Sequence, residues 1–202
     1  MKLLESKTFL NLAKAYAGEC QAHIRYKFIE YGARYNNYKN IACIIDDLVY
    51  NEFNHARMFY TFIQDATNDE ITNIDISSGY PFKEKWDLME NLRLASEDEK
   101  NEGTKIYPQY AEIARKEGFE EIAMLFENIA NIEREHSRIL VDLYNQMKNK
   151  TLYKKTNVVA WKCADCGYIA EGKEPWQTCP VCKAERESII LKCDVSGPTK
   201  HK

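Results

Sequence analysis

The chain has 202 residues, 45% of them hydrophobic, and a formal net charge of −3 at pH 7. This length accommodates one large domain or two modest ones, and the hydrophobic share is sufficient for a real core. The nearly balanced charge gives no electrostatic basis for binding nucleic acid or a membrane surface, so we expect neither as a partner.

Two long helices are predicted in the first third of the chain. Residues 6–35 carry apolar side chains in an i, i+3, i+4 stripe, and residues 39–67 continue this pattern. Between residues 67 and 81 the composition changes to Asn, Asp, Ser, Gly and Pro, which predicts a loop. Three isoleucines within residues 71–76 could lie along a bundle, and the loop is long enough to cross between antiparallel helix pairs.

Two further helices are predicted over residues 82–116 and 119–149, with Gly118 as the break between them. Pro108 lies inside the first of these, where it should remove one backbone hydrogen bond and introduce a kink. The expected fold class is therefore mainly α, with a ferritin-like four-helix bundle over residues 1–148.

A pattern of glutamate and histidine is repeated in the predicted bundle. A glutamate is followed 33 or 34 residues later by Glu-x-x-His, as Glu19, Glu52 and His55 in the first copy and Glu99, Glu133 and His136 in the second. Positions i and i+3 share one helix face, so each Glu-x-x-His pair directs a carboxylate and an imidazole at one point. One such pair is commonplace on a solvated helix face. The duplication instead indicates a carboxylate-bridged two-metal site, for iron or manganese.

A second, smaller domain is predicted over residues 158–202, after a polar linker at 149–157. Helical periodicity is lost there, and a domain of this size needs more than its core to be stable. It contains two Cys-x-x-Cys knuckles, formed by Cys163, Cys166, Cys179 and Cys182. Four thiolates in a tetrahedron bind zinc or iron. A structural zinc ribbon has the same spacing, but iron is favoured because a one-electron centre could supply the two-metal site.

The seven cysteines of the chain are expected to be metal ligands and free thiols, not disulfides. The first residues enter amphipathic sequence directly, without the apolar core of a signal peptide. No run approaches 18 consecutive apolar residues. We therefore expect a cytoplasmic protein.

Five segments together resemble the rubrerythrin family. They are Gly18-Glu19-x-Gln21-Ala22, Glu52-Phe53-x-His55-Ala56, Glu99-x-x-Glu102 followed by Tyr107-Pro108, Glu133-x-x-His136, and the two cysteine knuckles. The resemblance covers nearly the whole chain, with the bundle first and a rubredoxin-like domain after it. It implies a non-haem di-iron peroxidase that reduces hydrogen peroxide to water and protects against oxidative stress.

The resemblance also implies cofactors and partners. Three Fe ions per chain are expected, two in a di-iron site and one mononuclear iron on the four cysteines. The electrons would come from an NAD(P)H-dependent rubredoxin reductase or a similar donor. The chain is expected to form a homodimer or a larger homo-oligomer in which electrons cross between subunits.

Carried over position by position, the resemblance implies a role for each residue of the site. Glu52 and Glu133 would bridge the two irons. One iron would have Glu99 and His136 as terminal ligands, and the other would have Glu19. The second iron would exchange Glu102 for His55 when the centre is reduced. Tyr26 and Tyr107 match tyrosines close to the family's site, and are candidate catalytic residues with Glu102 and His55. For both tyrosines, core packing with a satisfied hydroxyl is the alternative interpretation.

One departure from the family pattern is Gly103, which stands where family members often have a histidine. Glycine is unfavourable in a helix interior and could loosen the segment that must let Glu102 move. Cys20 and His23 are expected to be core or supporting residues, not ligands. Two other functions remain open: ferritin-like iron oxidation with oxygen, and a zinc-ribbon helical interaction module.

Overall fold

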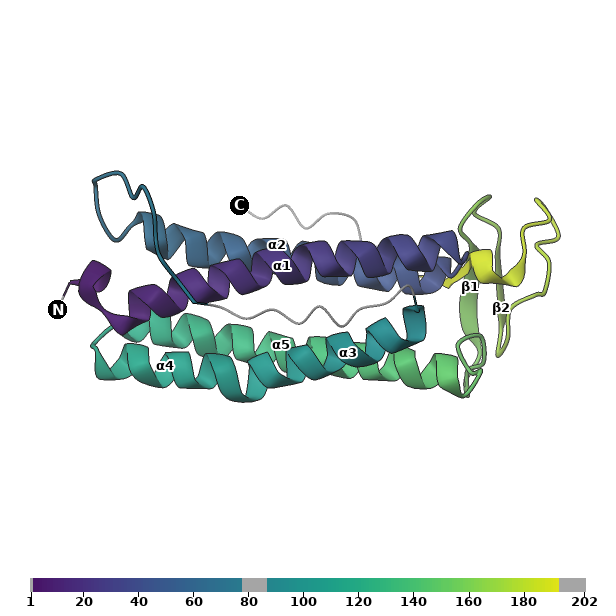
Figure 1. The fold of residues 1–202 in the computed structure, drawn as a ribbon. Coiled ribbons are helices and arrows are strands. Elements are labelled where there is room, and N and C mark those ends of the chain that lie inside the picture. The colour runs from purple at the N-terminus through teal and green to yellow at the C-terminus, as the bar shows by residue number, and fades with distance from the viewer. Residues whose placement is uncertain (1, 78–86, 193–202) are drawn as a thin grey trace.

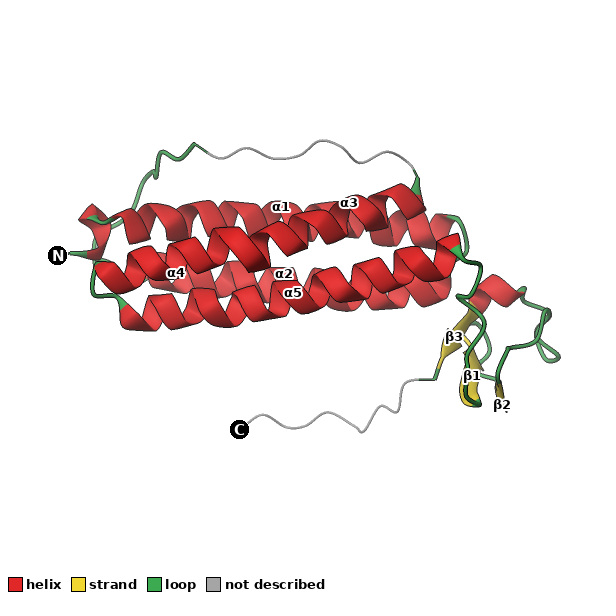
Figure 2. Ribbon diagram, turned by 90° about the horizontal axis from the view of Figure 1, so that it is seen from below, coloured by secondary structure: helices red, strands yellow, loops and turns green. Residues whose placement is uncertain are grey.

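The computed structural model describes residues 2–77 and 87–192, and consists of a bundle of long helices with a small β domain at one end (Figures 1 and 2). The helices are α1 (Lys7–Tyr35), α2 (Lys39–Gln64), α3 (Leu88–Asn101), α4 (Tyr107–Lys116) and α5 (Glu120–Lys148), preceded by the short 3₁₀ turn η1 (Leu3–Glu5). The strands are β1 (Val159–Cys163), β2 (Ile169–Gly172) and β3 (Ile189–Leu191). The predicted fold class is confirmed.

Local sequence signals set the helix boundaries. The side-chain oxygen of Ser6 accepts a hydrogen bond from the Phe9 N–H at the start of α1, and Asp87 does the same for Glu90 at the start of α3. The turn from α1 to α2 requires a positive φ of 64° at Asn37, and the turn from α4 to α5 requires 88° at Gly118. Asparagine and glycine are the residues that adopt this left-handed conformation most readily.

The third predicted helix differs from the expectation in two ways. Its predicted beginning at residue 82 lies outside the described residues, and the helix that is described begins at Leu88 because Asp87 is extended and caps it. Directly before the predicted kink at Pro108, the regular helix is interrupted by a π-helical turn, η2 (Glu102–Ile106), in the five residues between α3 and α4. Pro108 itself lies in the first turn of α4, where a missing N–H is tolerated.

Two apolar clusters fill the bundle, one towards each end. The cluster near the start of α1 contains Phe59, Tyr107 and Phe126, whose ring centroids lie 5.2 to 5.9 Å apart. The isoleucines of the predicted loop, Ile71, Ile74 and Ile76, pack against this cluster as expected. The other cluster includes Tyr26 and lies towards the β domain. Between the two clusters, α1, α2, α3 and α5 each contribute a buried glutamate.

The β domain is a three-stranded antiparallel sheet in the order β2-β1-β3. Trp161 in β1 is fully buried, and its indole N–H donates to the Gly172 carbonyl at 3.0 Å. Trp161 and Ile189 belong to the same apolar cluster as Ile41 and Ile45 of α2. The sheet therefore packs directly on the end of its own bundle, and its core is continuous with the bundle core.

The segment predicted as a polar linker, residues 149–157, is partly buried in this junction. Leu152 and Tyr153 are only 4% and 8% exposed and belong to the apolar cluster that joins the two parts. An ion pair between Lys39 and Asp165 lies at the same junction. Within the described part of the chain, no helix is both long and apolar enough to cross a membrane.

Candidate metal centres

Six acidic and imidazole side chains form one buried layer across the middle of the bundle. They come from α1, α2, α3 and α5, and are Glu19, Glu52, His55, Glu99, Glu133 and His136, each no more than 3% exposed. The apolar clusters on both sides of the layer exclude water from it. Buried carboxylates of this number are costly unless cations or protons neutralise them.

The layer divides into two overlapping groups of potential ligands. Glu19, Glu52, His55 and Glu133 form one group, and Glu52, Glu99, Glu133 and His136 form the other, with the ligand atoms of each group within 4.8 Å of one another. Only the carboxylates of Glu52 and Glu133 belong to both groups. The two groups also bring the imidazole rings of His55 and His136 close together, with centroids 5.8 Å apart.

The two shared glutamates direct one oxygen to each group. Glu133 Oε1 lies 2.9 Å from His55 Nδ1, and Glu133 Oε2 lies 2.8 Å from His136 Nδ1. Glu52 is arranged in the same way, with Oε2 at 3.5 Å from His55 Nδ1 and Oε1 at 3.0 Å from His136 Nδ1. A carboxylate that presents one oxygen to each of two ligand groups can bridge two cations.

The chemistry of these donors fits a pair of metal ions. Among the described residues, the buried side-chain atoms without a hydrogen-bond partner include Glu19 Oε2, both oxygens of Glu52 and of Glu133, Glu99 Oε2, and Nδ1 of both His55 and His136. Buried polar atoms are normally paired, and so many orphaned atoms at one place require an explanation. Two cations ligated by oxygen and imidazole would satisfy all of them.

Several side chains of the layer have pKa values that differ from their usual values. Burial raises the pKa of both Glu19 and Glu99. Burial alone would lower the pKa of His136, but the adjacent carboxylates of Glu133 and Glu52 outweigh it and raise the pKa to about 9. Because metal ligands must be deprotonated to bind, cation binding at this layer is expected to release protons.

Two buried tyrosines each hold a terminal carboxylate. The Tyr26 hydroxyl donates to Glu99 Oε1, and the Tyr107 hydroxyl donates to Glu19 Oε1. In each case the other oxygen, Oε2, faces the ligand group and has no hydrogen-bond partner. Burial raises the pKa of both tyrosines, so both remain protonated donors. These tyrosines therefore orient two of the potential ligands.

Glu102 lies outside both ligand groups, although the sequence favours it as a site residue. It is half-buried on η2, and burial, with Glu133 and Glu52 nearby, raises its pKa to about 8. Cys20 and His23 also lie outside the groups. The ring of His23 is hydrogen-bonded to the Val49 carbonyl through Nδ1, at 2.8 Å.

Asn51 also lies near the site, although no sequence motif marks it. Its Nδ2 atom lies 3.4 Å from Nε2 of His136, the ring nitrogen that faces away from the carboxylates. The only sequence signal is its position directly before Glu52. With Nδ1 on a metal, Nε2 carries the proton, so Asn51 would fix this ring by accepting from Nε2 through its amide oxygen.

The four cysteines of the β domain form a second type of site. Cys163 Sγ lies 3.6 Å from Cys182 Sγ, and Cys166 Sγ lies 3.6 Å from Cys179 Sγ. A tetrahedral site with metal–sulfur bonds of about 2.3 Å has sulfur atoms about 3.8 Å apart. The cysteines therefore fit one tetrahedrally ligated ion, and no disulfide links them.

The two cysteine knuckles have equivalent backbone geometry. The N–H of Gly167 donates to the Cys163 carbonyl, and the N–H of Lys183 donates to the Cys179 carbonyl, both at 3.0 Å. Both donors have positive φ angles, 78° and 67°. Cys163 and Cys179 are buried, whereas Cys166 and Cys182 are exposed, so one edge of the site faces solvent.

Comparisons with known proteins match both the helical part of the chain and its β domain. The family model for rubrerythrin matches residues 11–144 and 90–160, and the model for the rubredoxin-like domain of rubrerythrin matches residues 161–189. A rubrerythrin of Clostridium perfringens is 39% identical over 90% of this chain and 93% of its own length. A rubrerythrin of Porphyromonas gingivalis is 35% identical over 88% of this chain and 86% of its own length.

Solved structures of nigerythrin share the fold. A structure of its mixed-valence state superimposes with a TM-score of 0.60 and covers 95% of this chain and 94% of the nigerythrin chain. The sequence identity is 22%, so this similarity supports the architecture alone.

Proposed function

This chain belongs to the rubrerythrin family, and from that premise we propose that it is a non-haem di-iron peroxidase that reduces hydrogen peroxide to water. One observation supports this most strongly: Glu52 and Glu133 each direct one oxygen to each of two ligand groups, on a chain that also carries a four-cysteine site. The proposed role is protection against oxidative stress.

We propose three Fe ions per chain, two in the carboxylate layer and one on the four cysteines. The two carboxylate and histidine groups and the four-cysteine group are compatible with that loading. When bound, the di-iron pair would supply the two electrons that cleave the O–O bond of peroxide, and the mononuclear iron would replace them one at a time. The cysteine site serves no evident purpose in iron storage, which disfavours a ferritin-like function.

The proposed roles of the protein side chains follow from their contacts. Glu52 and Glu133 neutralise both cations at once, while Tyr26 and Tyr107 hold the outer oxygens of Glu99 and Glu19 so that the inner oxygens can ligate. Because these hydroxyls are buried and protonated, each could also pass a proton to the carboxylate that it contacts. The flanking apolar clusters exclude bulk water.

Glu102 and His55 are proposed to exchange as ligands of one iron. In this structure His55 Nδ1 lies among the carboxylates and Glu102 lies outside them. That arrangement matches the reduced state expected from the family resemblance. Glu102 is one turn beyond Glu99, so rotation of its side chain on η2 could bring its carboxylate to the layer.

The first test of the function is a stopped-flow experiment. The fully reduced, iron-loaded protein should be oxidised much faster by hydrogen peroxide than by dioxygen. Two stored electrons are enough to reduce peroxide to water, whereas dioxygen requires four. The measurement is the rate of the absorbance change on mixing with each oxidant. Faster oxidation by dioxygen, with accumulation of ferric iron beyond the proposed loading, would support iron storage and contradict the peroxidase.

We further propose that the protein is a homodimer or larger assembly in which electrons pass between chains from an NAD(P)H-dependent rubredoxin reductase or a similar donor. His136 lies twelve residues before Lys148, the end of α5, which is a rise of about 18 Å along the helix. The β domain packs beyond that end, so the cysteines of a chain begin far from its own carboxylate layer.

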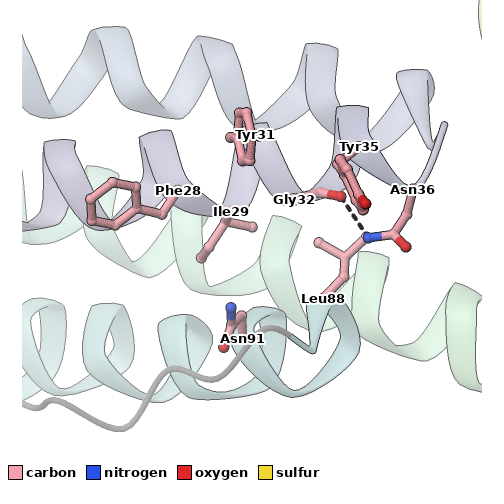
Figure 3. Close-up of a pocket in the computed structure, with 8 residues that line it drawn as sticks. All are labelled: Phe28, Ile29, Tyr31, Gly32, Tyr35, Asn36, Leu88 and Asn91. Carbon is pink, nitrogen blue, oxygen red and sulfur yellow. Dashed lines mark hydrogen bonds between the residues drawn. The ribbon is translucent and has the colours of Figure 1, made fainter.

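A surface on α1 supports association with a second copy. Phe28, Tyr31 and Tyr35 are 58%, 60% and 81% exposed, and they line a groove of about 420 Å³ that Leu88 and Asn91 close on the other side (Figure 3). Exposed aromatic groups gathered in this way are typical of protein–protein contacts.

Electron transfer between chains can be tested by mixing two inactive variants. Subunits with Cys179→Ser lack the cysteine centre, and subunits with Glu133→Ala lack the di-iron centre. If electrons cross between chains, mixed dimers should recover reductase-linked peroxidase activity, up to one working path per dimer. Subunit exchange is verified by mass spectrometry of the intact assembly. Proven exchange without recovered activity would contradict the transfer.

A further inference from the structure

The π-helical turn η2 leaves one backbone carbonyl without a helical partner. In this turn the Tyr107 N–H bonds to the Glu102 carbonyl, five residues earlier. The next bond of the same type would run from residue 108 to the carbonyl of Gly103. Residue 108 is proline, which has no N–H. The carbonyl of Gly103 must therefore find its donor elsewhere, directly beside Glu102.

Arg134 of α5 supplies that donor. Its Nη1 atom donates to the Gly103 carbonyl at 2.6 Å, across 31 residues of sequence, and its Nη2 atom donates to Asn131. Arg134 directly follows Glu133, the glutamate shared by both ligand groups. The hydrogen bond thus ties the turn that carries Glu102 to the helix segment that carries a shared carboxylate.

Gly103 is required for this close approach. A Cβ atom at this position would lie 2.8 Å from the Ala130 carbonyl oxygen, 2.8 Å from Arg134 Cγ and 2.9 Å from Arg134 N. Two of these three atoms belong to the α5 backbone, so they could move only if the helices separated. Gly103 therefore lets η2 contact α5 directly, instead of loosening the segment.

We propose that Arg134 and Gly103 are positioning residues that hold η2 in its π-helical form and thereby set where the Glu102 carboxylate lies relative to the metal site. Glu102 is the first residue of the turn, and it is half-buried next to the layer. Without the Arg134 hydrogen bond, the Gly103 carbonyl would lose its partner and the turn would relax, which would displace Glu102. This proposal rests on the proposed function, in which Glu102 ligates the oxidised centre.

The test is the midpoint reduction potential of the iron-loaded di-iron centre. Loss of a carboxylate ligand of the oxidised state favours the reduced state, so Glu102→Gln should raise the potential. Arg134→Met should also raise the potential. Residues that support a ligand change metal affinity by about 10- to 100-fold, and we expect a shift of at least ~10-fold in the ferric–ferrous equilibrium. Gly103→Ala should raise the potential as well. Arg134→Lys keeps a donor for the carbonyl, so its potential should stay close to that of the unmodified protein.

The matched control is Arg138→Met, one turn further along α5. Arg138 is 74% exposed and pairs with Glu135 at 3.0 Å, so its loss should leave the potential unchanged. A double-mutant cycle separates positioning from general destabilisation. In a Glu102→Gln background, Arg134→Met should cause no further shift, because both changes act through the same carboxylate. Thermal unfolding of each metal-free variant verifies that it is folded.

The outcomes distinguish this proposal from the proposed function. If Glu102→Gln raises the potential while Arg134→Met and Gly103→Ala do not, the positioning role is overturned and the peroxidase assignment is unaffected. Additive shifts in the double variant also overturn it, since Arg134 would then act independently of Glu102. If Glu102→Gln itself causes no shift, the ligand role of Glu102 fails, and the positioning role fails with it.

Discussion

Replacing Glu133 with alanine should abolish the two-metal centre of the bundle. Glu133 directs Oε1 to the group containing His55 and Oε2 to the group containing His136, at 2.9 and 2.8 Å. Its removal takes one ligand and one negative charge from both groups at once. We expect the affinity for iron at the bundle to fall by more than ~100-fold, beyond the range for residues that only support a ligand. The measurement is iron bound per chain, after correction for the iron on the cysteines.

The fold should survive this substitution. Two apolar clusters, each with several fully buried side chains, flank the layer and pack the helices independently of it. Circular dichroism should therefore show an unchanged helix content in Glu133→Ala. The control is Glu135→Ala on the same helix, because the Glu135 side chain is 55% exposed and contacts Arg138 instead of the layer. Two irons retained in the bundle of Glu133→Ala would show that the ligand assignment is wrong.

The clustering of carboxylates and histidines in one layer could be predicted from the sequence because its determinants are local and periodic. Glu52 with His55, and Glu133 with His136, lie one turn apart on a helix, so a prediction of helix alone places each pair on one face. The repeat of the unit then brings both pairs to the same level of an antiparallel bundle. The cysteine site was predictable for a similar reason, since a short Cys-x-x-Cys spacing nearly defines a knuckle.

Features that depend on contacts between distant segments could not be predicted. Pro108 indicated an interruption of the helix. The form of that interruption, a π-helical turn, is accompanied by a hydrogen bond from Arg134, which lies on another helix. Likewise, the composition of residues 149–157 is polar, and only the docked sheet explains why Leu152 and Tyr153 are buried. The bonds from Tyr26 to Glu99 and from Tyr107 to Glu19 also join different helices.

Replacing Cys179 with serine should separate electron delivery from peroxide chemistry. Cys179 Sγ lies 3.6 Å from Cys166 Sγ, and the side chain is fully buried, so its loss removes one of four thiolates from the tetrahedron. When the di-iron centre is reduced chemically, peroxide should still oxidise it at the rate of the unmodified protein. Turnover driven by NAD(P)H and a reductase should fall to the background rate of the reductase. Stopped-flow oxidation and steady-state NAD(P)H consumption measure the two processes separately.

Two controls decide whether the missing iron, and not a damaged β domain, causes this loss. Cys43→Ser changes a cysteine of α2 that lies outside the four-cysteine group, and it should leave both rates unchanged. Zinc bound by the four native cysteines should keep the sheet folded, because zinc and iron both accept tetrahedral thiolates, but zinc carries no electrons. A protein with zinc on the cysteines and iron in the bundle should therefore behave like Cys179→Ser. Full reductase-linked turnover in that protein would mean that electrons enter the bundle directly, and that the β domain is structural.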